Sequence, residues 1–128
     1  MKKKNVKPSA ITNKRARYDY EVSDSIIAGI ILSGAETKSL RMGHGIIRGS
    51  FVSIKNDEIW LNNMQINPLK TNINHLPENE RTKPRKLLVT KKQIGQLMDA
   101  KHQGLSIIPI KLLTQSRFIK VEIGIGKG

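Results

Sequence analysis

The sequence predicts a mainly β fold, a small antiparallel β-barrel of the oligonucleotide-binding type with two or three short flanking helices. Five or six short segments are rich in β-branched residues and are separated by turn signals. Two Ser/Thr patterns of the capping-box type mark the starts of short helices. The 128 residues are enough for one hydrophobic core, so we expect a single β-barrel domain over residues 13–128.

Residues 1–12 are expected to form a disordered basic arm. They contain four lysines followed by a proline and a serine, and nothing among them is expected to pack. Such an arm either keeps the protein soluble or touches RNA, and the sequence favours neither reading.

The composition also bears on location. The chain has no cysteine, which excludes disulfides and fits a reducing cytoplasm. No apolar segment follows the N-terminal lysines, so secretion is not expected. No apolar run approaches the roughly 20 residues that a membrane helix requires. We therefore expect a cytoplasmic protein without a membrane partner.

The dominant property is charge. Twenty-three Lys and Arg against ten Asp and Glu give a formal net charge of +13. A domain this small with that excess has the composition of a polyanion binder. A merely soluble basic surface is the alternative. An anionic membrane is less favoured, because no predicted helix pairs lysines on one face with Trp or Phe on the other.

The first segment of the domain is basic and contains two tyrosines. Arginine side chains match phosphate geometry and an asparagine can read a base edge. The candidates for RNA contact here are Asn13, Lys14, Arg15 and Arg17. The alternative is a basic loop leading into a strand. Tyr20 and Val22 then alternate as in a strand, and residues 23–25 are expected to form a turn.

Residues 29–43 are expected to contain a short buried strand followed directly by a short helix. Residues 30–32 are apolar and rich in β-branched residues, as in a buried strand. Ser33 and Glu36 have capping-box spacing, and Gly43 can take the left-handed conformation that ends a helix. Lys38 and Arg41 are three residues apart and share one face of this helix.

A β-hairpin is expected over residues 50–66. Residues 50–56 and 58–66 form its strands, and Asn56-Asp57 is a turn pair. Trp60 is central in the second strand, which favours a place in the core over a role as a stacking platform. Residues 68–84 are expected to be irregular. His75 has no Asp or Cys at ligand spacing, so we expect no metal site.

A second basic segment precedes the next helix. Residues 81–92 carry six cations and no acid. The candidates for RNA contact in this segment are Arg85, Lys86 and Lys91. Thr90 and Gln93 form a second capping box, and the helix is expected to end at Gly104. The helix dipole disfavours cations at a helix start, so an anionic partner explains this placement better than a structural role.

Two strands are expected to complete the sheet. Residues 105–113 are mostly apolar and are expected to form a strand, and Pro109 predicts an edge or a bulge because it lacks an N–H. Residues 118–125 alternate, with Ile119, Val121 and Ile123 on one face.

The chemistry favours structured RNA over single strands. Base stacking is expected to contribute little, because the few aromatic residues are partly required in the core. Folded RNA is recognised by shape, phosphates and 2′-hydroxyls, which requires cations more than rings. Glu36 is accounted for as a capping residue, Gly43-His44-Gly45 is a flexible helix exit, and no Gly-rich phosphate loop is present. We expect no catalysis, cofactor or metal.

Four segments together resemble the small protein B family, the tmRNA-binding proteins of bacterial trans-translation. They are Asn-Lys-Arg-Ala-Arg and Tyr-Asp-Tyr in residues 13–20, Ala-Gly through Gly-Ala-Glu-Thr-Lys-Ser-Leu-Arg in residues 28–41, Arg-Lys-Leu-Leu-Val in residues 85–89, and Gly-Ile-Gly-Lys-Gly in residues 124–128. The resemblance extends over residues 13–128.

The resemblance implies an oligonucleotide-binding-type barrel that binds the tRNA-like domain of tmRNA and delivers this RNA to stalled ribosomes. It implies elongation factor Tu and alanyl-tRNA synthetase as indirect partners. Together with the charge pattern, it places RNA contact on Asn13, Lys14, Arg15, Arg17, Glu36, Lys38, Arg41, Arg85, Lys86, Leu88 and Lys91. The cations are expected to converge on one side of the β-scaffold. The alternatives are a structural ribosomal or ribosome-assembly protein and a nucleic-acid-processing enzyme.

The chain departs from the family pattern at three positions and at its end. Ile27 stands where an acidic residue is usual, Tyr18 where His is usual and Thr37 where Val is usual. The family continues past Gly-Lys-Gly with a basic tail that occupies the decoding region of the ribosome. This tail is absent from the chain, so the resemblance implies tmRNA binding without productive tagging.

Overall fold

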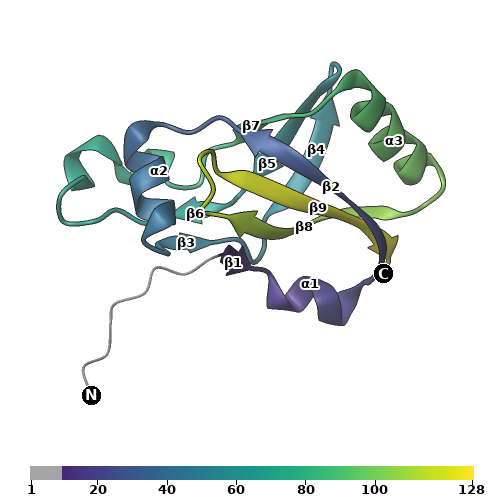
Figure 1. Ribbon diagram of the computed structural model, residues 1–128, viewed down its shortest axis with the longest axis horizontal. Coiled ribbons are helices and arrows are strands. Elements are labelled where there is room, and N and C mark those ends of the chain that lie inside the picture. Colours follow the sequence, from purple (N-terminus) through teal and green to yellow (C-terminus); the bar gives the residue numbers. More distant parts are fainter. Residues whose placement is uncertain (1–9) are drawn as a thin grey trace.

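The computed structural model describes residues 10–128, apart from the side chain of Arg17 (Figure 1). The fold is mainly β, with a seven-stranded antiparallel sheet in the order β1-β8-β9-β2-β7-β5-β4 and a two-stranded pair, β3-β6. The strands are β1 (Ala10–Thr12), β2 (Glu21–Ile30), β3 (Gly45–Ile46), β4 (Phe51–Lys55), β5 (Glu58–Asn62), β6 (Gln65–Ile66), β7 (Arg85–Leu88), β8 (Ser106–Leu113) and β9 (Lys120–Lys127).

Three α-helices accompany the sheet, as expected. They are α1 (Lys14–Asp19), α2 (Gly34–Arg41) and α3 (Lys91–His102). Within residues 68–84, which contain neither a strand nor an α-helix, two 3-10 turns form, η1 (Ile73–His75) and η2 (Glu78–Glu80). No helix within residues 10–128 is both long and apolar enough to cross a membrane.

The sheet is curved but its hydrogen bonding does not close. β1 and β4 are the two edge strands, and among the described strands they are not paired with each other. β4 lies near β8 across the seam, and α1 and α3 also contact β8. The predicted antiparallel β architecture is therefore confirmed, whereas a closed barrel is not observed.

The alternating pattern of the last strand correctly predicts which of its residues are buried in the core. Ile119, Val121, Ile123 and Ile125 are all buried, as expected from the period of two. Their neighbours on the central strands complete one core cluster, which also contains Leu87 and Leu97. Trp60 is outside this cluster and only half-buried, so its predicted core position is wrong.

Two irregularities shape the long strands. β2 runs continuously through residues 23–25, where a turn was expected, because a register shift between Val22 and Asp24 absorbs the disruption. In β8 a register shift follows Pro109, as its missing N–H predicted. β8 is not an edge strand, since β1 pairs with it on the other side.

The N-terminal part of the domain is more ordered than its sequence indicates. Ala10–Thr12, expected in the disordered arm, pairs with β8 as strand β1. The rest of that expectation concerns residues 1–9, which lie outside the described part of the chain. The basic segment that follows forms the helix α1 instead of a loop.

The predicted helix boundaries are confirmed. Ser33 with Glu36 and Thr90 with Gln93 both form reciprocal capping boxes at the starts of α2 and α3. Gly43 and Gly104 follow the two helices with φ of 80° and 81°, the left-handed conformation that glycine adopts without strain. The strand before α2 ends earlier than expected, at Ile30, and Ile31 is 53% exposed.

The predicted hairpin is confirmed with a shorter second strand. Asn56 and Asp57 both have positive φ, which suits the tight turn between β4 and β5. β5 stops at Asn62 because Asn63 also takes a positive φ, and the chain then enters β6.

Candidate nucleic-acid interface

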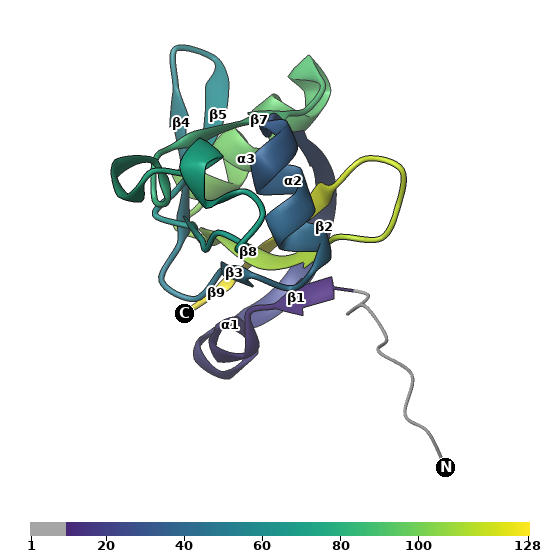
Figure 2. The same cartoon turned by 90° about the vertical axis from the view of Figure 1, so that its left-hand side faces the viewer.

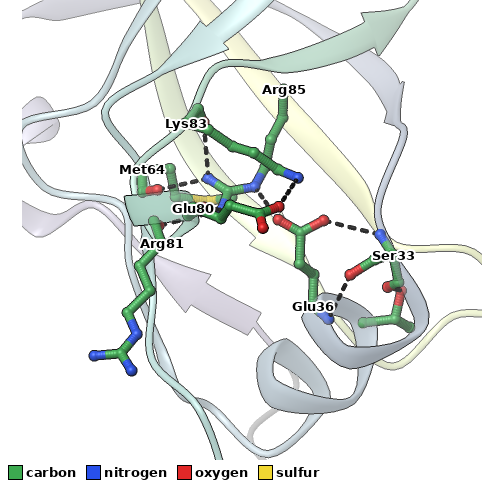
Figure 3. A network of polar contacts seen from close by, with 8 residues as sticks. Ser33, Glu36, Met64, Glu80, Arg81, Lys83 and Arg85 are labelled. Carbon is green, nitrogen blue, oxygen red and sulfur yellow. Dashed lines mark hydrogen bonds and ion pairs between the residues drawn. The ribbon is translucent and has the colours of Figure 1, made fainter. Parts of the chain in front are cut away.

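A buried ion pair connects the two segments that carry most of the candidate residues (Figure 3). The Arg85 Nε lies 2.6 Å from the Glu36 Oε2, and the two side chains are 1% and 5% exposed. The other two guanidinium nitrogens of Arg85, Nη1 and Nη2, donate to four carbonyl oxygens, those of Met64, Glu80, Arg81 and Lys83. The guanidinium group of Arg85 therefore binds only partners within the described part of the chain in this structure.

The two carboxylate oxygens of Glu36 accept hydrogen bonds from different partners. Its Oε1 accepts the backbone N–H of Ser33 at 2.8 Å, which completes the capping box of α2. Its Oε2 accepts from Arg85. Burial by itself would raise the pKa of Glu36, but the Ser33 hydrogen bond and the Arg85 guanidinium favour the charged form and leave the pKa below its usual value.

This geometry favours a positioning role for Glu36 and Arg85, and their direct contact with RNA stays a prediction. Both side chains are almost fully buried. The sequence does not reveal this, because it does not distinguish an arginine that binds carbonyl oxygens within the protein from one that binds phosphate. The pair instead fixes α2 against the segment that leads into β7. Asn72, which the sequence analysis missed, adds to this: its side-chain amide donates to Ala35 O and Ser39 Oγ, both at 3.1 Å.

Asn13 is also a positioning residue. It is 5% exposed, its Oδ1 accepts the Ala16 N–H at the start of α1, and its Nδ2 donates to Pro109 O at 3.0 Å. Both ends of the amide are therefore occupied, which favours a positioning role for Asn13, and reading of a base edge by this residue stays a prediction. The residue caps α1 and attaches it to β8.

Arg41 lies at the end of α2 and holds the loop between β8 and β9. Its Nη1 donates to Thr114 O at 2.7 Å and to Ser116 O at 2.9 Å, and its Nη2 donates to Arg117 O at 2.9 Å. In return, the Gln115 side chain donates to Arg41 O at 3.1 Å. The guanidinium is half-buried and serves mainly to order this loop.

The exposed candidates occupy two surfaces. The first, the α1 surface, is a hollow of about 360 Å³ lined by Thr12, Lys14, Arg15, Tyr18 and Arg48. Tyr18 is 92% exposed there, and within residues 10–128 the one ion-pair partner of Arg15 is Asp19, at 3.3 Å. Arg48 was missed by the sequence analysis, because an isolated cation in a loop gives no local signal. Arg17 belongs to the same helix, but its side chain lies outside the described residues.

The second, the β7 surface, consists of the outward residues Lys86 and Leu88 and the adjoining Gly29. Lys86 and Leu88 alternate with the buried Arg85 and Leu87, so they project from the opposite face of the strand. Leu88 is 52% exposed and packs over Gly29, where a Cβ would lie 3.3 Å from the Leu88 Cβ. The absent side chain of glycine thus leaves Leu88 accessible.

Two further exposed lysines accompany these surfaces. Lys91 opens α3, three residues after Leu88, and Lys38 projects from α2 into a hollow that it shares with Ser33 and His75. Within residues 10–128 no three His, Cys, Asp or Glu residues gather as metal ligands would.

The structure does not place α1 next to β7, so the convergence of all cations on one side stays a prediction. α1 contacts β8, whereas Lys86 lies on β7, and the sheet order places β9 and β2 between these strands. In both views α1 lies below the sheet and β7 near its top (Figures 1 and 2). The described residues present the α1 surface and the β7 surface as two separate surfaces with candidate contact residues, and buried polar contacts position the elements around them.

Comparison with known proteins shows which family has this sequence and this architecture. The model of the family described as SmpB protein matches residues 10–128. An SsrA-binding protein of Lysinibacillus sphaericus is 42% identical over 119 residues, covering 91% of this chain and 74% of the relative. One from Staphylococcus carnosus is 41% identical over 131 residues, covering 99% and 81%.

A solved structure agrees with the sequence relatives. It is described as "tmRNA-SmpB: a journey to the center of the bacterial ribosome" and superposes with a TM-score of 0.75 at 33% identity, covering 94% of this chain and 85% of that chain. Family model, relatives and fold are consistent over nearly the whole chain. The chain therefore belongs to the SmpB protein family.

Proposed function

We propose that this protein binds the tRNA-like domain of tmRNA and delivers this RNA to stalled ribosomes in trans-translation. The observation that carries the proposal is the 33% identical structure described as tmRNA-SmpB at the ribosome. The net charge of +13 and the exposed cations on the described part of the chain supply the electrostatic attraction that a folded RNA requires. The proposal has no catalytic step.

The candidate residues divide by role in this proposal. Direct contact belongs to exposed side chains, Lys14, Arg15, Lys38, Lys86, Leu88 and Lys91, with Arg48 added and Arg17 retained through its place in α1. Positioning belongs to the buried or internally bonded residues Asn13, Glu36, Arg41 and Arg85. Cations contribute affinity through phosphates, and Leu88 offers an apolar contact for a ribose or base.

The sheet serves in this proposal as a barrel of the oligonucleotide-binding type, with its seam between β4 and β8. Elongation factor Tu and alanyl-tRNA synthetase are proposed as indirect partners that act on the same RNA. The ribosome is the site of delivery, which places the protein in the cytoplasm.

A competition experiment tests the specific claim. We expect this protein to shift a labelled tRNA-like fragment of tmRNA in a native gel, and we expect ordinary tRNA to compete less well than the unlabelled fragment. Shape recognition would produce this difference, because both RNAs offer the same phosphate chemistry. Equal competition by both RNAs would favour a structural ribosomal or assembly role over the proposed one.

Salt dependence tests the contact residues. If six phosphates are neutralised, affinity falls roughly 10³-fold between 50 and 200 mM salt, and each lost contact lowers the slope by about one unit. We expect Lys38→Ala and Lys91→Ala each to flatten the slope of log K against log salt, measured by filter binding. Lys101→Ala, an exposed lysine at the far end of α3, is the matched control and should leave the slope unchanged. Slopes that are equal in all three variants would contradict these assignments.

A further inference from the structure

The outward face of the hairpin β4–β5 carries an aromatic residue that the core does not use. Trp60 is the single tryptophan of the chain and lies opposite Ser53 on β4 and Lys86 on β7. Its neighbours Ile59 and Leu61 are buried at 1% and 0% exposure, so alternation directs Trp60 away from the core. A half-buried indole on an outward face presents part of its ring to solvent.

A groove of about 680 Å³ surrounds this position. It is lined by Lys55, Asn56, Glu58, Trp60, Asn62, Lys83 and Pro84, from β4, β5 and the segment before β7. A volume of this size is in the range of small-molecule sites, which is sufficient for one nucleotide. The β4–β5 hairpin stands out at the top of the molecule, so the groove can be approached from solvent (Figure 2).

The charges of the groove favour an anion. Lys55 is exposed and has no ion-pair partner among the described residues. Lys83 pairs with Glu80 at 3.1 Å while retaining an exposed side chain. The single carboxylate that lines the groove, Glu58, is already neutralised by Lys86 at 2.7 Å. A phosphate entering beside Trp60 therefore meets the unpaired ammonium group of Lys55 and the ion-paired one of Lys83, while the carboxylate that lines the groove is itself ion-paired.

The groove is continuous with the β7 surface. Trp60 and Lys86 are direct cross-strand partners, and Leu88 follows Lys86 on the same face of β7. An RNA strand that contacts Lys86 and Leu88 therefore passes next to the indole without changing face.

We propose that this groove, the Trp60 groove, binds an unpaired nucleotide of the RNA, with its base stacked on the indole of Trp60 and its flanking phosphates at Lys55 and Lys83. Stacking on an aromatic side chain is independent of base identity, because every base has a π-face. This inference rests on the proposed RNA binding and adds a ring contact to it, contrary to the sequence-based expectation that stacking contributes little.

Intrinsic fluorescence tests the proposal without a variant, since Trp60 is the only tryptophan. We expect saturable quenching on titration with a single-stranded RNA oligonucleotide, and weaker or no quenching with inorganic polyphosphate of matched charge. Equal quenching by both ligands would mean that the groove responds to charge alone and would overturn the stacking proposal. Unchanged fluorescence with the oligonucleotide would overturn it as well.

Variants provide the second arm, with affinity for the tRNA-like fragment of tmRNA measured by filter binding. We expect Trp60→Leu to weaken binding between about fivefold and 150-fold, which corresponds to 1–3 kcal/mol for one stacked base. Trp60→Phe, which retains a ring, should recover a large part of this loss. Urea denaturation of each variant shows whether the fold is retained.

The failure of this inference is distinguishable from failure of the proposed function. If Trp60→Leu binds within twofold of the unsubstituted protein while Lys38→Ala and Lys91→Ala weaken binding, the groove is not a subsite and the proposed function stands. If the unsubstituted protein itself does not prefer the tRNA-like fragment over ordinary tRNA, the proposed function fails whatever Trp60 does.

Discussion

Replacing Arg85 by methionine is expected to lower the free energy of unfolding by about 3–5 kcal/mol, because it leaves the Glu36 carboxylate buried without its cationic partner. The substitution also removes donors from the carbonyl oxygens of Met64, Glu80, Arg81 and Lys83. Urea denaturation followed by circular dichroism measures the change.

Lys86→Met is the matched control for this experiment. Lys86 is the next residue along β7, and its ion pair with Glu58 is exposed, at 39% and 43% of the two side chains. Exposed pairs contribute between about 0 and 1 kcal/mol, so this variant should unfold almost like the unsubstituted protein. Equal losses in the two variants would contradict the special role of the buried pair.

The pH dependence of stability provides an independent check on Glu36. Its pKa in the folded protein is lowered, so its contribution is present above the unfolded-state value, about 4.3, and is lost as the pH falls below that value. In Arg85→Met the guanidinium no longer lowers the pKa of Glu36, so this pKa rises and the stability that the ionised carboxylate contributes at neutral pH becomes smaller. The difference between the two stability curves should therefore narrow towards low pH. Parallel curves would contradict the assigned cause.

The second large effect is expected at Gly126, where Ala should lower the free energy of unfolding by about 3 kcal/mol, at the upper end of what overpacking produces. A Cβ at this position would lie 2.4 Å from Glu21 O and 3.0 Å from Val22 Cα. Both atoms belong to the backbone of β2, so no side chain can rotate away. The β2–β9 pairing at this end must move apart.

Gly95→Ala is the matched control, with the opposite sign. Gly95 lies inside α3, and a Cβ there meets no atom within 4 Å. Alanine should therefore stabilise the protein by about 0.5–1 kcal/mol through helix propensity. Chemical denaturation of the two single variants checks the signs, and a loss at Gly95 similar to that at Gly126 would contradict the argument.

The parts of the fold that follow local rules were predictable. The alternation of residues 118–125, the capping boxes of α2 and α3 and the turn at Asn56-Asp57 depend only on near neighbours in sequence. α1 and the continuous β2 were missed, because their stability comes from contacts with β8 and β9, which lie far along the chain. Tertiary pairing overrides the turn propensity of residues 23–25.

The candidate site divides in the same way. Composition correctly indicated an RNA-binding family, because net charge is a property of the whole chain. The role of each cation depends on which partner the fold brings to it. Glu36 and Arg85 are 49 residues apart in sequence, and Arg41 is more than 70 residues from the carbonyl oxygens it binds. The residues next to Glu36, Arg85 and Arg41 in the sequence give no indication of these long-range contacts.

The pairing of β1 with β8 and of β2 with β9 has a consequence during synthesis. The first strands emerge from the ribosome long before their partners, so the nascent chain cannot complete its central sheet until residues 106–127 are available. Such distant pairings give a high contact order, which is associated with folding in milliseconds to seconds and not in microseconds. Until then the apolar face of β2 is unprotected, and the growing polypeptide carries its basic segments beside the ribosomal RNA that is making it.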